Sequence, residues 1–381
     1  MRWLSSVRLP AEAGLWRIGV DREGLISSVN RLEAGSAARG ESWGGDWLSP
    51  MGIDLQINGG LGLAFPELSP NDLPRLLELL ELLWRDGVEA IAPTLVTCGV
   101  AELRQALSVL QQARNSHQPG RCRLLGAHLE GPFLAEERRG AHPRQHLAAP
   151  SLEALHARIA GFSGGADADI ALMTLAPELD GAAEVIDALQ AQGILVSLGH
   201  SAASEGQAEA AFSRGVGMIT HAFNAMPGLH HRAPGPIAAA LRRGDVALGL
   251  IADGVHVAPS MAVLLQRLAP EQVVLVSDAL APYGLSDGSH RWDERTLIVE
   301  NGSCRLEDGT LAGVTLPLLE GVRRLAAWGG DADQAIAAAT VLPRRLLGLR
   351  TPLRQHLIGT PLSHSLRWST TPSGLHWQRL D

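Results

Sequence analysis

The chain has 381 residues, of which 46% are hydrophobic and 19% are charged. This composition provides enough apolar material for a large core and excludes an intrinsically disordered chain. The formal net charge of −8 comes from 32 arginines and 40 acidic residues, with no lysine and no basic run. We therefore expect no nucleic-acid partner.

The cysteines and the N-terminal residues indicate the compartment. Cys98, Cys122 and Cys304 are scattered and form no CxxC pair, which is typical of a reducing compartment without a disulfide framework. Charged residues and a proline interrupt the first 20 residues, so no signal peptide is expected. No uncharged apolar run reaches the roughly 18 residues of a membrane span. The sequence predicts a cytoplasmic protein that does not interact with membranes.

Both ends of the chain have the pattern of short β-strands. Trp16, Ile18 and Val20 alternate with polar residues or glycine near the N-terminus, and Leu366 and Trp368 do so before a turn near the C-terminus. The segment between these ends has a different pattern. We predict two domains: a small β-sandwich from residues 1–48 and 349–381, and a metal-dependent catalytic domain from residues 49–348.

The central segment alternates apolar strands with helices. Near-continuous apolar strands of this kind indicate a parallel sheet covered by helices, and eight units close into a (β/α)8 TIM-like barrel. An open doubly wound sheet is the alternative, but no GxGxxG motif opens any unit. The eight predicted strands are 51–57, 88–96, 124–129, 170–175, 194–198, 217–220, 246–251 and 273–276.

Several helices and hairpins have clear end signals. A helix is expected from an N-cap at Ser69 with an apolar stripe as far as Trp84. A second helix, 178–192, is expected to end before Gly193. After the eighth strand, tight turns predict hairpins between residues 296 and 309, followed by helices from 317 to 347.

Histidine and acidic residues stand at the ends of four predicted strands. Glu130 follows the third strand, His200 the fifth, His221 the sixth and Asp278 the eighth. In a parallel barrel these ends meet on one face. Each residue alone has an ordinary structural explanation, such as a hydrogen-bonded core histidine or a helix-capping carboxylate. Their coincidence favours a metal site, because a buried Glu needs a partner or a metal.

Several short segments, in their order along the chain, resemble the motifs of one known family. The segments are HLEGPF (128–133), RRGAH (138–142), LGHS (198–201), THAFNAM (220–226), HHRAPG (230–235), ADGVH (252–256) and SDA (277–279). In this order they resemble the N-acetylglucosamine-6-phosphate deacetylases of the amidohydrolase superfamily. The resemblance implies a barrel with a small β-sandwich made from both ends of the chain.

The resemblance implies that Glu130, His200 and His221 are the metal ligands. Many amidohydrolases carry His-x-His on the first strand and a carboxylated Lys between two metals. This chain has Gln56 and Asn58 on that strand and no lysine. We therefore expect one divalent ion per subunit, best matched by Zn²⁺, with Fe²⁺ or another divalent ion as the alternative.

The resemblance also implies a mechanism and a substrate. Asp278 is expected to act as general base and then acid for a metal-activated water, while His142 stabilises the oxyanion. Arg232 is expected to bind the sugar phosphate, across the interface of a homodimer. The expected substrate-binding residues are Ala141, His142, Asn224, Ala225, Arg232, His256, Leu311, Ala312, Gly313 and Val314.

Two departures from the family pattern keep alternatives open. Tyr283 and its neighbours are bulkier than expected after the catalytic Asp, and the tail after Leu347 differs from the usual one. Deacetylation of another N-acetyl sugar phosphate or of an N-acyl amino acid therefore remains an alternative. A non-catalytic barrel that binds a sugar phosphate is a third hypothesis.

Overall fold

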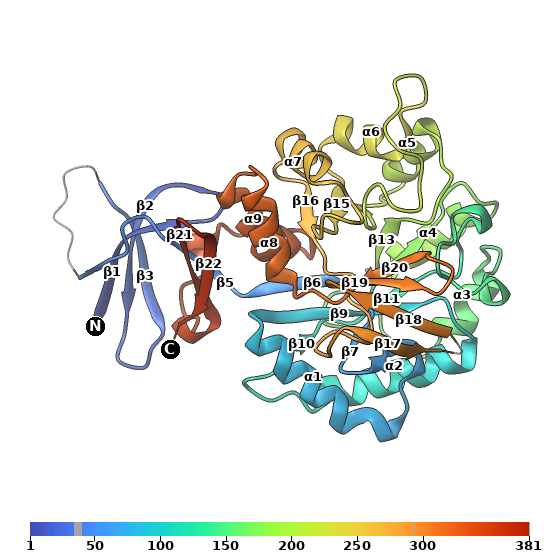
Figure 1. Ribbon diagram of the computed structural model, residues 1–381, viewed down its shortest axis with the longest axis horizontal. Coiled ribbons are helices and arrows are strands. Elements are labelled where there is room, and N and C mark those ends of the chain that lie inside the picture. Colours follow the sequence, from blue (N-terminus) through green and yellow to red (C-terminus); the bar gives the residue numbers. More distant parts are fainter. Residues whose placement is uncertain (34–39, 294, 381) are drawn as a thin grey trace.

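The structure is a computed structural model that describes residues 1–33, 40–293 and 295–380. Its centre is a barrel of eight parallel strands surrounded by helices (Figure 1). The strands are β6 (Gly52–Ile57), β9 (Val88–Val96), β11 (Ala127–Glu130), β12 (Ile170–Leu175), β13 (Leu195–Leu198), β14 (Met218–Ile219), β15 (Ala247–Leu250) and β16 (Val273–Leu275). This confirms the predicted fold class.

The ladder runs from β6 to β16 with every neighbouring pair parallel. Across the remaining seam, the Asp278 backbone N–H donates to the Gln56 carbonyl oxygen at 2.9 Å. This bond closes the barrel at the carboxyl ends of β6 and β16.

One predicted strand is broken. The predicted strand 124–129 is two short strands, β10 (Arg123–Leu124) and β11, separated by Leu125 and Gly126. Gly126 has φ +111, and a Cβ there would lie 2.7 Å from the Ala168 carbonyl oxygen. The prediction of one continuous strand was wrong because this close contact comes from a distant segment that local hydropathy does not reveal.

The covering helices follow the apolar periodicity. They are α1 (Leu73–Arg85), α2 (Val100–Asn115), α3 (Leu152–Ile159), α4 (Ala182–Ala191), α5 (Glu205–Ser213), α6 (Gly235–Arg243), α7 (Pro259–Leu268) and α8 (Leu318–Ala327). The predicted N-cap of α1 was wrong: Ser69 caps a 3-10 turn (Pro70–Asp72), and α1 begins after it. Helix α4 begins later than predicted, and Gly193 follows it with φ +73 as expected.

Strands from both chain ends form a separate sheet. They are β1 (Arg2–Leu9), β2 (Glu12–Val20), β3 (Ile26–Arg31), β4 (Glu41–Ser42), β5 (Trp47–Pro50), β21 (Ser365–Thr371) and β22 (Gly374–Arg379). The strand order is β22-β21-β5-β1-β2-β3, with β4 against β1. Trp368 of β21 is fully buried, and its indole N–H donates to the Ser49 hydroxyl at 2.9 Å. Only Met51 separates β5 from barrel strand β6.

A four-stranded antiparallel sheet follows β16. Its strands are β17 (Gly288–Trp292), β18 (Arg295–Glu300), β19 (Ser303–Leu306) and β20 (Leu311–Val314). The predicted hairpins are present, and β17 is an additional strand. A bridge between Ala279 and Val314 ties β20 to the segment after β16, beside the barrel opening. The chain then continues through α8, α9 (Ala332–Thr340), α10 (Leu342–Leu346) and α11 (Leu353–His356).

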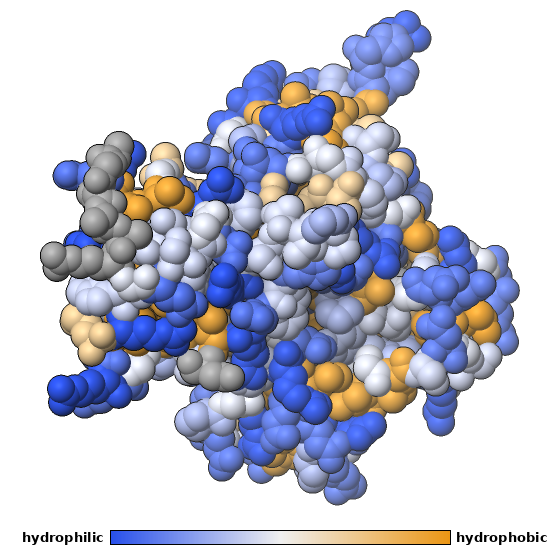
Figure 2. All heavy atoms as spheres, turned by 60° about the vertical axis from the view of Figure 1, so that its left-hand side comes forward, coloured by the Kyte–Doolittle hydropathy of each residue, from blue (hydrophilic) through white to orange (hydrophobic). Residues whose placement is uncertain are grey.

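The face of the molecule seen in Figure 2 is mostly polar. Figure 2 shows a largely hydrophilic face with hydrophobic residues in small separate groups. Among the described residues, no helix has the length and apolarity required to cross a membrane. The segment between β14 and α6 projects from the body beside α5 and α6, at the top of Figure 1.

Candidate metal centre and catalytic pocket

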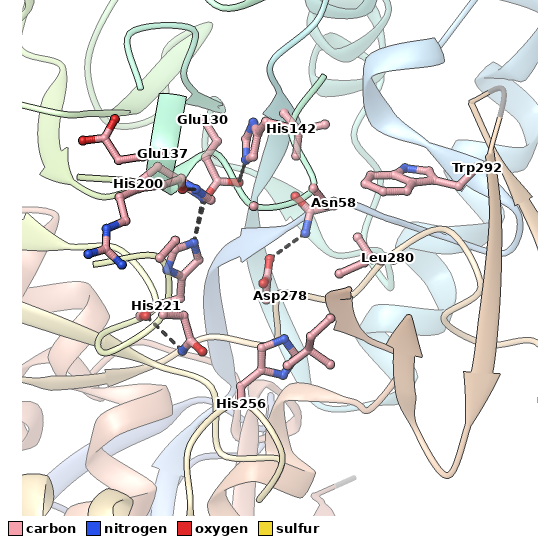
Figure 3. Close-up of a pocket in the computed structure, with 18 residues that line it drawn as sticks. Asn58, Glu130, Glu137, His142, His200, His221, His256, Asp278, Leu280 and Trp292 are labelled. Atoms are coloured by element: carbon pink, nitrogen blue, oxygen red, sulfur yellow. Dashed lines mark hydrogen bonds and ion pairs between the residues drawn. The ribbon is translucent and has the colours of Figure 1, made fainter. Parts of the chain in front are cut away.

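Three side chains from different strand ends converge at the barrel opening. Glu130 ends β11, His200 follows β13 and His221 follows β14, and all three are buried. Glu130 Oε1 lies 3.3 Å from His200 Nε2 and 3.2 Å from His221 Nε2. The two Nε2 atoms are 3.0 Å apart. Figure 3 shows the three groups turned toward one another.

This triangle fits a divalent metal ion. A tetrahedral site with ligand bonds of about 2.0–2.1 Å places its ligand atoms roughly 3.3 Å apart. The three measured edges lie within a few tenths of an ångström of this value. His142 is also close, and Glu130, His142 and His200 form a second possible ligand group. The site therefore offers four candidate ligands.

Hydrogen bonds on the far side of the rings distinguish these histidines. His200 Nδ1 lies 2.9 Å from the Arg138 carbonyl oxygen, so Nδ1 carries the proton and Nε2 keeps its lone pair for a metal. His142 Nδ1 accepts from the Thr97 backbone N–H at 3.3 Å, so the neutral ring carries its proton on Nε2. Its Nε2 is 3.7 Å from Glu130 Oε2. In this arrangement His142 Nε2 can donate a hydrogen bond, whereas His200 Nε2 has a lone pair available for a metal.

The charge state of the centre follows from burial and contact. Burial, followed by the nearby His200, lowers the pKa of His142 to about 3, so its ring is neutral. Burial acts to raise the pKa of Glu130, but its contacts with His200 and His221 outweigh it and hold this pKa well below its ordinary value. Glu130 is therefore an anion in this centre.

Asp278 faces the centre and is held by two amides. Its Oδ1 accepts from Asn58 Nδ2 at 2.7 Å and from Gln56 Nε2 at 3.1 Å. Gln56 Nε2 also donates to Glu130 Oε1 at 3.1 Å. Burial and the charge of Glu130 raise the pKa of Asp278. A carboxylate held through one oxygen and with a raised pKa is suited to accept a proton on the other oxygen.

The backbone is strained where these side chains leave their strands. His200, His221 and Asp278 have φ values of +47°, +30° and +51°. Left-handed φ is uncommon for residues other than glycine and collects at functional sites. The strain turns the three side chains into the opening rather than along the barrel wall.

His128 belongs to the barrel interior. Its ring nitrogens contact the hydroxyl groups of Thr94 at 3.2 Å and Thr174 at 2.7 Å. Burial lowers the pKa of His128 to about 4, so the ring is neutral. It supports the strand that carries Glu130 and does not enter the pocket.

The centre lies in a cavity of about 350 Å³. The cavity contains the four strand-end residues and seven other residues expected at the substrate site: Ala141, His142, Asn224, Ala225, His256, Leu311 and Ala312. His256 is fixed by a 2.7 Å contact between its Nδ1 and Asp253 Oδ2.

Three other predicted substrate-binding residues do not line this cavity. Gly313 and Val314 lie behind it: a Cβ at Gly313 would be 2.8 Å from the Asp278 carbonyl oxygen, which also accepts from the Val314 N–H at 3.2 Å. Arg232 is exposed, in the projecting segment between β14 and α6.

The cavity is also lined by residues that were not predicted from the sequence. These residues are Asn58, Val96, Glu137, Arg138, Leu280 and Trp292. The sequence drew attention to Asn58 only because it stands where other amidohydrolases have a histidine, and its hydrogen bond to Asp278 becomes apparent only in the structure. Tyr283 does not narrow the cavity, because it is buried elsewhere and its hydroxyl donates to Asp86.

Known proteins with similar sequences include several N-acetylglucosamine-6-phosphate deacetylases. An N-acetylglucosamine-6-phosphate deacetylase of Bos taurus is 39% identical over 315 residues, which cover 80% of this chain and 76% of that protein. One of Vibrio furnissii is 33% identical and covers 90% and 83%. The chain belongs to the N-acetylglucosamine-6-phosphate deacetylase family. No protein-family model matches this member of the family.

Solved structures agree with this family. The deacetylase from Thermotoga maritima has a TM-score of 0.79 at 28% identity, covering 96% of this chain and 94% of its own. A mutant deacetylase from Mycobacterium smegmatis, in complex with N-acetyl-D-glucosamine-6-phosphate, has a TM-score of 0.76 at 28% identity. It covers 91% of this chain and 90% of its own.

Proposed function

We propose that the protein hydrolyses the acetamide of N-acetylglucosamine 6-phosphate to glucosamine 6-phosphate and acetate. The observation that carries this proposal is the 3.0–3.3 Å triangle of Glu130, His200 and His221 facing Asp278, in a chain of this family. A binding-only barrel would not require a carboxylate poised beside a metal-ligand triangle.

We assign Glu130, His200 and His221 as ligands of one Zn²⁺ ion per subunit. Such an ion would polarise the acetyl carbonyl and lower the pKa of water toward neutrality. A single ion is supported by Gln56 and Asn58, because their amide N–H groups donate to Glu130 and Asp278 instead of facing a second metal. Two imidazoles and one carboxylate suit Zn²⁺, and Fe²⁺ is the alternative.

Asp278 and His142 are assigned to catalysis. Asp278 accepts the proton of the attacking water on Oδ2, since Asn58 and Gln56 occupy Oδ1. It then delivers this proton to the departing sugar amine. The Nε2–H of His142 donates to the carbonyl oxygen as negative charge develops there.

The sugar is assigned to the remaining predicted residues. Asn224, Ala225, His256, Leu311 and Ala312 line the cavity beside Asp278 and can contact the ring. Ala141 lines it near His142. Gly313 and Val314 act through the Asp278 backbone, which they contact.

We assign the phosphate to Arg232 of a second subunit in a homodimer. The side chain is exposed and lies outside the cavity of its own chain, which supports a role in a partner's site. A guanidinium provides the planar pair of donors that a phosphate accepts.

We also retain the predicted compartment and domain limits. The free thiols of Cys98, Cys122 and Cys304 support a cytoplasmic location. The limits of residues 1–48 and 349–381 for the β-sandwich, and 49–348 for the barrel, fall within β5 on one side, where the two parts join.

The 4-epimer of the substrate is the second candidate. An N-acetylgalactosamine-6-phosphate deacetylase of Escherichia coli O157:H7 is 33% identical over 328 residues, covering 86% of this chain and 84% of that protein. Both sugars would present the same acetamide to Asp278, so they differ only in contacts at the ring.

The direct test measures acetate release from both sugar phosphates by the Zn²⁺-loaded protein. Wild type is expected to be active, with the higher kcat/KM on the gluco epimer, and Asp278→Asn to lose about 10²–10⁴-fold in kcat. The matched control is Asp187→Asn, an exposed carboxylate on α4, with unchanged activity. No acetate release by wild type would overturn the proposed function, and an active Asp278→Asn would overturn the role of Asp278.

A further inference from the structure

A second cavity lies directly beside the catalytic one. It has a volume of about 700 Å³, and Val96 and Trp292 line both cavities. On its other sides it is bounded by residues around Pro66, Cys98 and Gln145. Trp292 is therefore the wall between two spaces, and neither the metal centre nor the sugar site accounts for the second space.

The catalytic cavity is apolar on the side of Trp292. Leu280 and Trp292 are 1% and 7% exposed and belong to one small cluster, against which Val96, Ala141 and Ala312 pack. In Figure 3, Leu280 and Trp292 lie to one side of Asp278, while His256 lies below it and the histidines of the metal centre lie opposite. The groups able to bind sugar hydroxyls are thus separated from this apolar side.

The two substituents of the substrate amide differ in polarity, as the two sides of the cavity do. The carbonyl carbon must lie between the metal centre and Asp278, and it carries the sugar nitrogen on one side and the acyl methyl on the other. Hydroxyl groups lose hydrogen bonds against an apolar wall, whereas a methyl gains from burial there. The acyl group is therefore directed toward Leu280 and Trp292.

We propose that Leu280, Val96 and Trp292 form the acyl pocket and that the Trp292 indole is its end wall, which restricts the enzyme to acetyl groups. This proposal rests on the proposed deacetylase function. Beyond the indole is the second cavity, so a smaller side chain at 292 would join the two spaces and make room for longer N-acyl chains.

Contacts on the outer face hold the indole in place. The Arg295 guanidinium carbon lies 4.4 Å from the centre of the Trp292 ring. The same guanidinium donates to the Ala141 carbonyl oxygen at 2.8 Å and pairs with Asp293. The β17–β18 hairpin is thereby tied to the segment carrying His142, and the wall has little freedom to move aside for a larger acyl group.

The test compares N-acetyl-, N-propanoyl- and N-butanoyl-glucosamine 6-phosphate as substrates of the Zn²⁺-loaded full-length enzyme. One methylene in such a pocket changes kcat/KM by roughly 10–200-fold, so wild type is expected to prefer acetyl over butanoyl by about 100-fold or more. Trp292→Ala is expected to raise the butanoyl-to-acetyl ratio of kcat/KM by about 10–100-fold. Trp292→Phe, which retains part of the wall, is expected to give an intermediate ratio.

The matched control is Gln145→Ala, which enlarges only the second cavity and should leave the ratio unchanged. A wild type that accepts butanoyl as readily as acetyl overturns the acyl pocket, whether or not Trp292→Ala folds. So does an unchanged ratio in a folded, Zn²⁺-binding Trp292→Ala. In both cases acetate release by wild type still stands; if wild type releases none, the proposed function itself fails and this proposal fails with it.

Discussion

Two amide side chains, Gln56 in β6 and Asn58 just after it, hold the buried carboxylates of Glu130 and Asp278. Gln56 bridges Glu130 and Asp278, and Asn58 makes the shorter bond to Asp278. An amide N–H fixes a carboxylate without neutralising it. The bond from Asn58 lowers the pKa of Asp278, but burial and the charge of Glu130 outweigh it and leave this pKa raised. Gln56 and Asn58 therefore act as hydrogen-bond donors that orient Asp278, the proposed general base.

Removing the Asn58 amide is expected to impair the chemical step. Asn58→Leu keeps the volume and removes a hydrogen bond to a charged group, so kcat should fall about 10–100-fold. KM for the sugar phosphate should change less than threefold, roughly, because Asn58 acts through Asp278. Acetate-release assays measure kcat and KM, and a Zn²⁺ titration checks that the variant still binds the metal. A raised KM with unchanged kcat would instead place Asn58 in substrate binding.

Asp54 gives the fold a pH dependence of its own. Burial raises the pKa of this carboxyl to about 7, against bonds from Ser277 and Gln56 that lower it. In the unfolded chain the pKa is about 3.9. Because the folded pKa is the higher one, the stabilisation from this proton is fully present below about pH 4 and is lost as the pH rises through 7.

Asp54→Asn should remove this dependence. Between about pH 5.5 and pH 8, the unfolding free energy of wild type is expected to fall by about 2 kcal/mol more than that of Asp54→Asn. Urea unfolding of the metal-free proteins measures the difference. Asp180→Asn, an exposed carboxyl, serves as the control and should parallel wild type. If the unfolding free energies of wild type and Asp54→Asn changed with pH in parallel, the raised pKa of Asp54 would be contradicted.

At the scale of the element, strand β15 approaches the end of β14 through a glycine. A Cβ at Gly249 would lie 3.0 Å from the Ile219 carbonyl oxygen and 3.2 Å from the His221 backbone nitrogen. The Gly249 carbonyl also accepts from the Ala222 N–H at 2.6 Å. The position of His221 is therefore set by a neighbouring strand.

Gly249→Ala should weaken the metal centre without touching a ligand side chain. The added methyl displaces the His221 backbone, and Zn²⁺ affinity is expected to fall about 10–100-fold. Competition with a chromogenic chelator measures it. Gly206→Ala on α5, where a Cβ has no neighbour within 4 Å, is the matched control and should bind Zn²⁺ as wild type does. Wild-type affinity in Gly249→Ala would show that β15 does not position His221.

Much of the barrel and its centre could be predicted because each strand carries its own signal. The apolar runs define eight strands, and a polar residue at the end of a buried run is informative by itself, as with Glu130. The break at Gly126 and the wall at Trp292 could not be predicted. Both depend on segments that meet only in the folded chain. Gly126 lies against Ala168, and Trp292 lies against the barrel opening.

At the scale of the whole molecule, the proposed role of Arg232 makes one subunit incomplete. Its side chain is exposed in a projecting segment, and sequence reasoning found it only through a resemblance, because nothing local distinguishes it from a surface arginine. If a partner supplies this group, two differently damaged subunits should complement each other.

Mixing Asp278→Asn with Arg232→Ala subunits tests this. In a mixed dimer one site has Asp278 and receives the intact Arg232 of the other chain, so about a quarter of wild-type activity should return after random exchange. Each variant alone should remain weakly active, and Arg242→Ala is a control for a surface arginine on α6. No recovery despite demonstrated exchange would place Arg232 in its own subunit's site or outside any site.

The pairing of β5 with β21 has a consequence for synthesis. The order β22-β21-β5-β1 places β21, which is synthesised after the whole barrel, along the outer edge of β5, which is synthesised before it. The strands that precede the barrel, with buried residues such as Leu48 and Leu4, must therefore wait for β21 while the barrel residues emerge. A nascent chain that stops before β21 keeps this edge of β5 uncovered and is expected to be recognised by chaperones or proteases, so the sheet acts as a check that the barrel was synthesised completely.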